Sequence, residues 1–288
     1  MGTITLWPSP AKINLFLHIN GKREDGYHEL QTLFAILDKG DSLSFKELET
    51  NEIIIKPDFD FPQEKNIVYK AVQALREYTN VIKGIEITIN KNIPMGGGLG
   101  GGSSNAATAL VALNSIWKLN INEDKLCEIG KKLGADVPVF IKGRSAFAEG
   151  VGEKLTPFEI EESYYLVVTP KNTNVSTKEI FTHPNLPRNT PKFSIDEINS
   201  VKLKNDCEEL VKNNYPIVAK TLLWLLKYAP SRMTGTGASC FAKFDSKEVA
   251  VNALNSMPNE LQGFVAKACN YSPLLTFVQQ FKDSACTK

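Results

Sequence analysis

The chain has 288 residues, a net charge of +1 and 42% hydrophobic residues, and this length favours two domains, each with its own core. Near-neutral charge gives no basic field to attract nucleic acid or an anionic membrane surface. We therefore expect neither kind of partner, and no apolar run is long enough to predict a membrane span.

The first predicted element is a strand over residues 11–19, where side chains alternate in character. Lys12 and Asn14 share one face of this strand, and Ile13 and Leu15 share the other. A polar turn at 23–26 follows it. The next ordered segments are a stretch beginning at 27–30, short strands at 43–45 and 52–55, a helix at 66–78 and a strand at 84–89.

The rest of the chain also mixes helices and strands. The predicted segments are helices at 105–119 and 123–133, a short apolar segment from 135, strands at 144–149 and 164–169, a turn-rich stretch at 171–191, one or two helices within 205–228, and strand, helix and strand at 240–244, 247–257 and 264–269. No long β-α-β series is present, so we predict an α+β fold. We place the domains at 1–160 and 161–288.

A glycine-rich loop joins the strand at 84–89 to the helix that follows. Six of the seven residues from Gly96 to Gly102 are glycine, which lets the backbone turn tightly and approach a ligand closely. The N-terminus of a helix adds unpaired N–H groups and a positive dipole end that favour a phosphate. A flexible linker does not usually lie between a strand and a helix, so we favour a phosphate-binding loop.

This loop is neither of the two common phosphate-binding motifs. A P-loop needs a lysine directly before its Ser or Thr, and no lysine occurs between Met95 and Trp117. A dinucleotide-binding fold needs an acidic residue at the end of a second strand, whereas Glu123 and Asp124 follow a helix. The cation that neutralises the phosphates must come from elsewhere in the chain.

Three segments together resemble motifs of the GHMP kinase superfamily, which includes galactose, homoserine and mevalonate kinases. They are PAKINL at residues 10–15, PMGGGLGGGSSNAA at 94–107 and MTGTGASCF at 233–241. The resemblance implies an N-terminal domain like ribosomal protein S5 domain 2 and a ferredoxin-like C-terminal domain. The third motif is less glycine-rich than in the wider superfamily.

Four further stretches resemble one group of GHMP kinases: DGYH at 25–28, GADVPVF at 134–140, AEGVGE at 148–153 and LPRNTP at 186–191. Members of that group phosphorylate a cytidine diphosphate-linked methylerythritol in non-mevalonate isoprenoid synthesis. The resemblance therefore implies a small-molecule partner of this kind, phosphorylation at its 2-hydroxyl, and ATP and Mg²⁺ as cofactors.

The resemblance implies that Lys12 and Asp136 form the catalytic pair. Asp136 would accept the proton of the attacking hydroxyl, and Lys12 would stabilise the charge that develops during transfer. The simpler alternatives are a helix cap for Asp136, because Pro138 marks a helix start, and a solvated strand lysine for Lys12. Asn14 would orient the acceptor hydroxyl, or is merely a polar strand residue.

The resemblance also implies an ATP site whose loop binds the phosphates through backbone N–H groups. Its residues are Pro94, Met95, Gly96, Gly97, Gly98, Leu99, Gly100, Gly101, Gly102, Ser103 and Ser104. The two serines also suit a helix cap, and Ser104 a Mg²⁺ ligand. Glu149 is a second Mg²⁺ candidate, or a surface carboxylate. Asn66 is expected to contact adenine or to cap the helix before Ile67.

At the acceptor end, the resemblance implies that Tyr27 and Phe181 stack on the cytosine and that His28 reads its polar edge. Stacking accepts any base, so discrimination requires hydrogen bonds to that edge. Thr177 is expected near the phosphates or diol of the substrate. Core packing for the two aromatic residues, and a turn role for His28, are the alternatives.

Two other functions compete with this one: a GHMP kinase for another alcohol, and a catalytically silent binding protein. The five scattered cysteines and three histidines argue against structural zinc and fit a reducing cytosol. The N-terminus lacks the pattern of a signal peptide, so we expect a cytoplasmic protein. The sequence leaves open whether it is a monomer or a homodimer.

Overall fold

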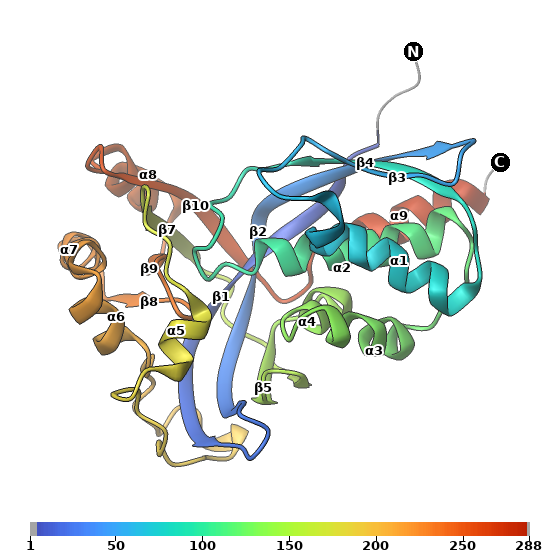
Figure 1. Cartoon of the computed structure of the whole chain (residues 1–288). Coiled ribbons are helices and arrows are strands. Elements are labelled where there is room, and N and C mark those ends of the chain that lie inside the picture. The colour runs from blue at the N-terminus through green and yellow to red at the C-terminus, as the bar shows by residue number, and fades with distance from the viewer. Residues whose placement is uncertain (1–4, 287–288) are drawn as a thin grey trace.

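The protein is seen in a computed structural model that describes residues 5–286 (Figure 1). Its strands are β1 (Trp7–Lys22), β2 (His28–Leu48), β3 (Ile53–Lys56), β4 (Gly84–Asn90), β5 (Ala146–Gly150), β6 (Lys154–Pro157), β7 (Tyr164–Pro170), β8 (Ser231–Met233), β9 (Cys240–Phe244) and β10 (Leu261–Cys269). Its helices are α1 (Ile67–Thr79), α2 (Gly101–Ile116), α3 (Glu123–Leu133), α4 (Val137–Lys142), α5 (Thr177–Thr182), α6 (Glu208–Asn214), α7 (Pro216–Leu225), α8 (Lys247–Asn255) and α9 (Pro273–Cys286).

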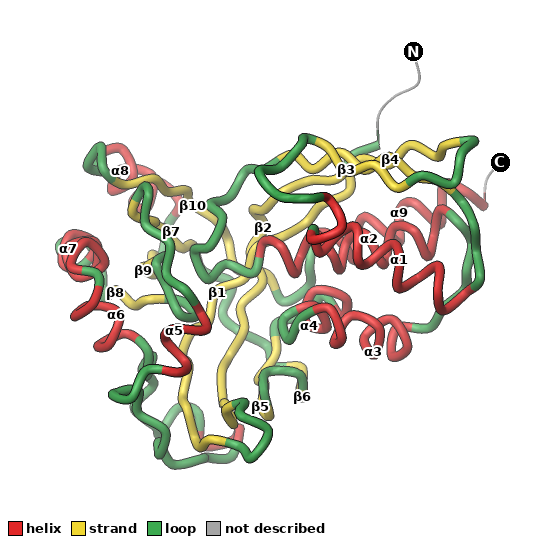
Figure 2. The backbone as a smooth tube through the Cα atoms, in the orientation of Figure 1, coloured by secondary structure: helices red, strands yellow, loops and turns green. Residues whose placement is uncertain are grey.

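The strands pair along one path, in the order β3-β4-β2-β10-β7-β9-β8, with β1 and β5 also bonded to β2. The pair β3–β4 is parallel, and the other pairs along the path are antiparallel. Figure 2 shows α1, α2, α3, α4 and α9 on one side of the molecule and α5 to α8 on the other. The long strands β1 and β2 run between these two groups.

The α+β class is confirmed, and so are most of the predicted elements. α3 matches its prediction at both ends, and α1, β4 and β9 match theirs within about two residues. Residues 43–45 are not a separate short strand, because they lie within the 21-residue strand β2. The predicted turn-rich stretch 171–191 also contains a short helix, α5.

Four apolar clusters form among the described residues, and neither of the two largest, called here the first and second cores, comes from one continuous segment. The first packs α1, α2 and α4 on β2 and β4, and it includes Leu274 of α9. The second contains residues of β7, β9 and α7, together with Leu17 and Ile19 of β1. The boundary at residue 160 stays a prediction. None of the helices in the described part of the chain is long and apolar enough to cross a membrane.

Candidate active site

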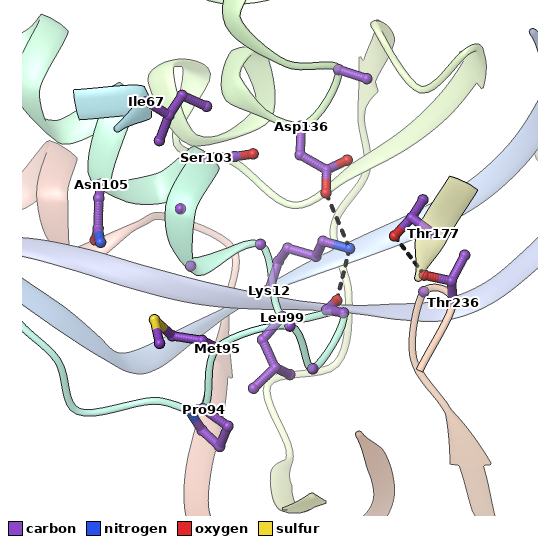
Figure 3. Close-up of a pocket in the computed structure, with 18 of the residues that line it drawn as sticks. Lys12, Ile67, Pro94, Met95, Leu99, Ser103, Asn105, Asp136, Thr177 and Thr236 are labelled. Carbon is purple, nitrogen blue, oxygen red and sulfur yellow. Dashed lines mark hydrogen bonds and ion pairs between the residues drawn. The ribbon is translucent and has the colours of Figure 1, made fainter. Parts of the chain in front are cut away.

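A cavity of about 670 Å³ lies where the two groups of helices meet. The glycine loop, the start of α2 and residues of β1 form much of its wall, and Thr177, Phe181 and Thr236 approach from the other half of the chain. Figure 3 shows Lys12 and Asp136 pointing toward each other across this space, with Thr177 and Thr236 nearby. The fold therefore brings together residues more than 200 positions apart in sequence.

Lys12 and Asp136 form an ion pair, with Lys12 Nζ 3.4 Å from Asp136 Oδ2. Lys12 Nζ also donates to Asn14 Oδ1 at 2.6 Å and to the Gly98 carbonyl at 3.1 Å. The Lys12 side chain is only 4% exposed, whereas that of Asp136 is 32% exposed. The ammonium is held in place, and the carboxylate remains open to a ligand.

The alternative that Lys12 is a solvated strand residue is wrong. Its backbone N–H donates to the Leu99 carbonyl at 3.1 Å, so the glycine loop covers the strand at this point. The register of β1 against β2 also shifts on either side of the segment from Lys12 to Asn14. Lys12 and Asn14, which lie between these irregularities, both line the cavity.

Asp136 occupies the position before the first residue of α4, as the helix-cap alternative requires. Its side chain makes no capping hydrogen bond there, however. Pro138, in the first turn, removes one backbone N–H that a cap would satisfy. The carboxylate is therefore available to Lys12 and to the cavity.

Asn14 lines the cavity, but its amide is already paired. Its Nδ2 donates to Thr32 Oγ1 at 2.8 Å, and its Oδ1 accepts from Lys12 Nζ and, at 3.3 Å, from Thr234 Oγ1. These contacts make Asn14 a residue that orients Lys12. Its predicted contact with the acceptor hydroxyl stays a prediction.

The glycine loop needs its glycines for two separate reasons. Gly98 and Gly100 have φ values of +76° and +70°, which L-residues with a Cβ rarely adopt. A Cβ on Gly98 would also lie 2.6 Å from the Thr234 carbonyl. The loop thus packs directly on the segment that follows β8.

That segment, residues 233–241, contacts the glycine loop through a hydrogen bond as well. Ser239 N–H donates to the Gly97 carbonyl at 3.2 Å, and the hydroxyls of Ser239 and Thr169 lie 2.6 Å apart. Sequence analysis gave these residues no role. The only signal in the sequence was the third motif itself, because spacing does not reveal which backbone it contacts.

The predicted cap on the following helix is wrong. The helix α2 begins at Gly101, with Gly100 before it and no capping side chain. Ser103 therefore lies in the first turn and lines the cavity. Ser104 is fully buried and accepts a hydrogen bond from Ser9 at 3.0 Å, so Ser103 is better placed to reach a ligand.

Asn66 does cap α1, since its side chain accepts from Val68 N–H at 2.9 Å. It also lines the cavity, so capping and ligand contact are compatible.

Glu149, the second Mg²⁺ candidate, does not line the cavity, and its carboxylate accepts a hydrogen bond from Gln31 at 3.1 Å. Among the described residues, no three His, Cys, Asp or Glu side chains are grouped to hold a metal ion.

The residues predicted for the acceptor end are only partly brought together. Phe181 and Thr177 line the cavity, and Thr177 Oγ1 lies 3.0 Å from Thr236 Oγ1. His28 is buried beside Phe181, with their ring centroids 5.2 Å apart. Tyr27 is 64% exposed at the turn and does not line the cavity.

His28 has one neighbour that sequence analysis missed. Arg188 Nε donates to His28 Nε2 at 3.0 Å. Burial lowers the pKa of His28, and the positive charges of Arg188 and Lys22 lower it further. Arg188 lies in the LPRNTP stretch, but nothing in that stretch indicated a contact with the turn at His28.

Comparison with known proteins places this site in a family. The model of the GHMP kinases N terminal domain matches residues 66–144, and that of the GHMP kinases C terminal matches residues 194–263. A protein of Tolumonas auensis named 4-diphosphocytidyl-2-C-methyl-D-erythritol kinase is 54% identical over 95% of this chain and 96% of its own. A protein of the same name from Shewanella piezotolerans is 55% identical over 95% and 97%.

Solved structures agree with these relatives. A 4-(cytidine 5'-diphospho)-2C-methyl-D-erythritol kinase matches with a TM-score of 0.79 and 28% identity, over 91% of this chain and 98% of that one. The mevalonate kinase of Methanococcus jannaschii matches with a TM-score of 0.65 and 16% identity, over 93% and 99%. The latter match shows a shared fold alone.

Proposed function

The chain belongs to the GHMP kinases and, within them, to the family of 4-diphosphocytidyl-2-C-methyl-D-erythritol kinases; on this premise we propose that it transfers the γ-phosphoryl group of ATP to the 2-hydroxyl of that cytidine compound. The products are the 2-phosphate and ADP. The observation that carries the proposal is the Lys12–Asp136 ion pair, which lines the same cavity as the glycine loop and Phe181.

We assign the proton transfer to Asp136. Phosphoryl transfer to an alcohol requires removal of the hydroxyl proton, and the remainder is positioning and charge stabilisation. The open Asp136 carboxylate suits the role of proton acceptor. Lys12, held by Asn14 and the Gly98 carbonyl, stabilises the negative charge on the attacking oxygen and on the transferred group.

The phosphates of ATP are proposed to bind at the glycine loop and the start of α2. Backbone N–H groups there are oriented by positive-φ glycines and lie at the positive end of the helix dipole. Ser103, which lines the cavity beside the glycine loop, would suit a Mg²⁺ ion held mainly by phosphate oxygens and water. Such an ion would neutralise negative charge on the phosphates during transfer.

The cytidine end is proposed to lie against Phe181 and His28, with Tyr27 supplying the second aromatic face from its turn. Thr177 suits a contact nearer the phosphates of the substrate, since it lines the same cavity.

We further propose that the protein is a cytoplasmic enzyme of non-mevalonate isoprenoid synthesis. The division into an ATP-binding domain at 1–160 and a substrate-binding domain at 161–288 stays a prediction.

A direct assay tests the proposal. Purified protein is incubated with Mg-ATP and the cytidine diphosphate-linked methylerythritol, and ³¹P NMR locates the new phosphate. A monophosphate resonance on the 2-oxygen is expected, with one ADP formed per acceptor. Faster phosphorylation of mevalonate, homoserine or galactose would favour another GHMP kinase, and ADP-free mixtures would indicate a binding protein.

A further inference from the structure

The guanidinium of Arg188 uses all five of its N–H donors within one small region. Its Nε donates to His28 Nε2 at 3.0 Å. Its Nη1 donates to the carbonyls of Pro184 and Leu186 at 3.4 and 3.0 Å. Its Nη2 donates to the carbonyls of Phe181 and His183 at 3.1 and 2.8 Å. One side chain thus connects the start of β2 to the end of α5.

The contact with Arg188 determines which nitrogen of His28 carries the proton. An arginine side chain only donates hydrogen bonds, so the His28 nitrogen that faces it must be an unprotonated acceptor. In a neutral imidazole the proton then lies on the other nitrogen, Nδ1. No described residue accepts a hydrogen bond from His28 Nδ1, so this donor has no partner in the described chain; His28 itself lies beside the cavity-lining Phe181 and not in the cavity wall.

The surroundings of His28 favour the neutral ring. The side chain is buried, and burial is the main cause of its lowered pKa. The charges of Arg188 and Lys22 act in the same direction. At neutral pH the ring therefore presents a single N–H donor on the Nδ1 side.

We propose that Arg188 is a positioning residue that sets base specificity by holding His28 in its Nδ1–H form. This inference rests on the proposed function. The Nδ1–H group donates to an acceptor such as N3 of cytosine. Uracil carries a hydrogen on its N3, so the same His28 donor rejects it. A histidine whose proton can move to Nε2 has an unprotonated Nδ1. That nitrogen can accept a hydrogen bond from N3–H of uracil, so the preference for cytosine over uracil is lost.

The other four hydrogen bonds extend the role of Arg188 to stacking. They fix the backbone from Phe181 to Leu186, and with it the Phe181 ring beside His28. The polar reader and one aromatic face are therefore positioned by the same group before any ligand binds. Preorganisation of this kind lowers the entropic cost of binding.

The first test is spectroscopic and needs no activity. Protein with ¹⁵N-labelled imidazoles is compared with the variants R188M and R188K, and the His28 signal is assigned with H28Q. We expect the wild type to carry its proton on Nδ1 and R188M to shift to the Nε2–H form. A wild-type His28 in the Nε2–H form, or an R188M variant still in the Nδ1–H form, would overturn the proposal.

The second test compares cytidine- and uridine-linked acceptors. In R188M the ratio of their kcat/KM values should fall about tenfold, the effect of roughly 1.4 kcal/mol, with KM for ATP unchanged. R188K should keep more of this ratio, because a lysine also donates to Nε2. The control R144M removes an exposed arginine that packs over Tyr271 and should leave the ratio unchanged.

The outcomes separate the two proposals. A merely structural role for Arg188 predicts equal losses on both acceptors and an unchanged ratio, which would contradict the inference alone. A wild type that does not phosphorylate the cytidine compound would instead contradict the proposed function. The tautomer measured by NMR would still decide the role of Arg188 in that case.

Discussion

The charged ammonium group of Lys12 is almost completely buried. Burying an ammonium is costly unless it is paired and hydrogen-bonded. Here an amide oxygen, a carbonyl oxygen and a carboxylate surround it, and the Phe34 ring centroid lies 5.2 Å from Nζ. The Asp136 carboxylate is 32% exposed and lines the cavity, so this partner of Lys12 remains accessible to a ligand.

Replacing Asp136 with asparagine tests this assignment. The variant D136N keeps the shape of the side chain but removes the proton acceptor, so kcat should fall about 10²-fold or more. KM for ATP should change little, because the glycine loop is untouched. A coupled ADP assay measures both constants. The matched control is D124N, at an 87% exposed carboxylate on α3, and near wild-type turnover of D136N would remove Asp136 from the mechanism.

His18 connects burial to the pH dependence of stability. Burial lowers its pKa, Asp206 opposes this shift, and Lys204 and Arg232 add to it. In the unfolded chain His18 therefore takes up a proton near pH 6.5, whereas in the folded chain it stays neutral to a lower pH. The contribution of His18 to the free energy of unfolding is therefore fully present above about pH 6.5. It is lost as the pH falls through the lower pKa that His18 has in the folded protein.

The variant H18Q should accordingly flatten the acid side of the stability profile. The melting temperature is measured between about pH 8 and pH 5, and we expect wild type to lose more of it than H18Q. The control H183Q changes a histidine at the end of α5 and should follow the wild-type curve. An H18Q profile parallel to wild type would show that His18 does not titrate in this way.

At the scale of elements, the sequence correctly predicted those helix limits that are determined by neighbouring residues. α3 has an Asn122 cap at its start and Gly134 at its end, and both limits were correct. The start of α2 was placed four residues late, because glycines in its first turn have no helical preference of their own. The length of β2 was missed because its pairing with β1, β4, β5 and β10 depends on distant partners.

The same reasoning explains which site residues the sequence located. Lys12, Asp136 and the loop were found through motifs, and the fold places them together. The supporting contacts of Thr234, Ser239 and Arg188 were not found. Each of these joins segments far apart in the chain, and hydrogen bonds of that kind leave no periodicity in a single sequence.

The packing of the glycine loop on the third motif gives a prediction for this element. G98A places a Cβ against the Thr234 carbonyl and strains a positive φ, so the loop must shift. Displacement by about 1 Å can cost about 10²-fold in rate, and we expect a loss of that order in kcat/KM for ATP. The control G21A has no atom within 4 Å of its added Cβ and should behave like wild type.

At the scale of the whole molecule, the strand β1 contributes both to the two largest cores and to the cavity. β1 contributes Trp7 to the first core, Leu17 to the second, and Lys12 to the cavity. The glycine loop and Phe181 line the same cavity, so a movement of one core against the other would change the shape of that cavity. The stability of both cores and the geometry of the site are linked through this strand.

The C-terminal helix α9 supports that strand from outside the site. Its Phe277 and Phe281 rings lie 4.9 and 4.8 Å from the Trp7 ring, and Leu274 is 1% exposed. Removing the Leu274 side chain leaves a cavity in the first core. The loss of a buried leucine side chain costs about 2–5 kcal/mol, whereas exposed positions cost about 0.5 kcal/mol or less.

The variant L274A should thus lower the free energy of unfolding by about 2–5 kcal/mol, measured by urea denaturation. The matched control L223A removes a 64% exposed leucine on α7 and should stay within about 0.5 kcal/mol of wild type. Because none of the α9 residues whose side chains are described lines the cavity, kcat of folded L274A at low temperature should remain near wild type. Equal stability of L274A and L223A would mean that α9 does not belong to the first core, and a large fall in kcat would mean that its packing sets the position of Lys12.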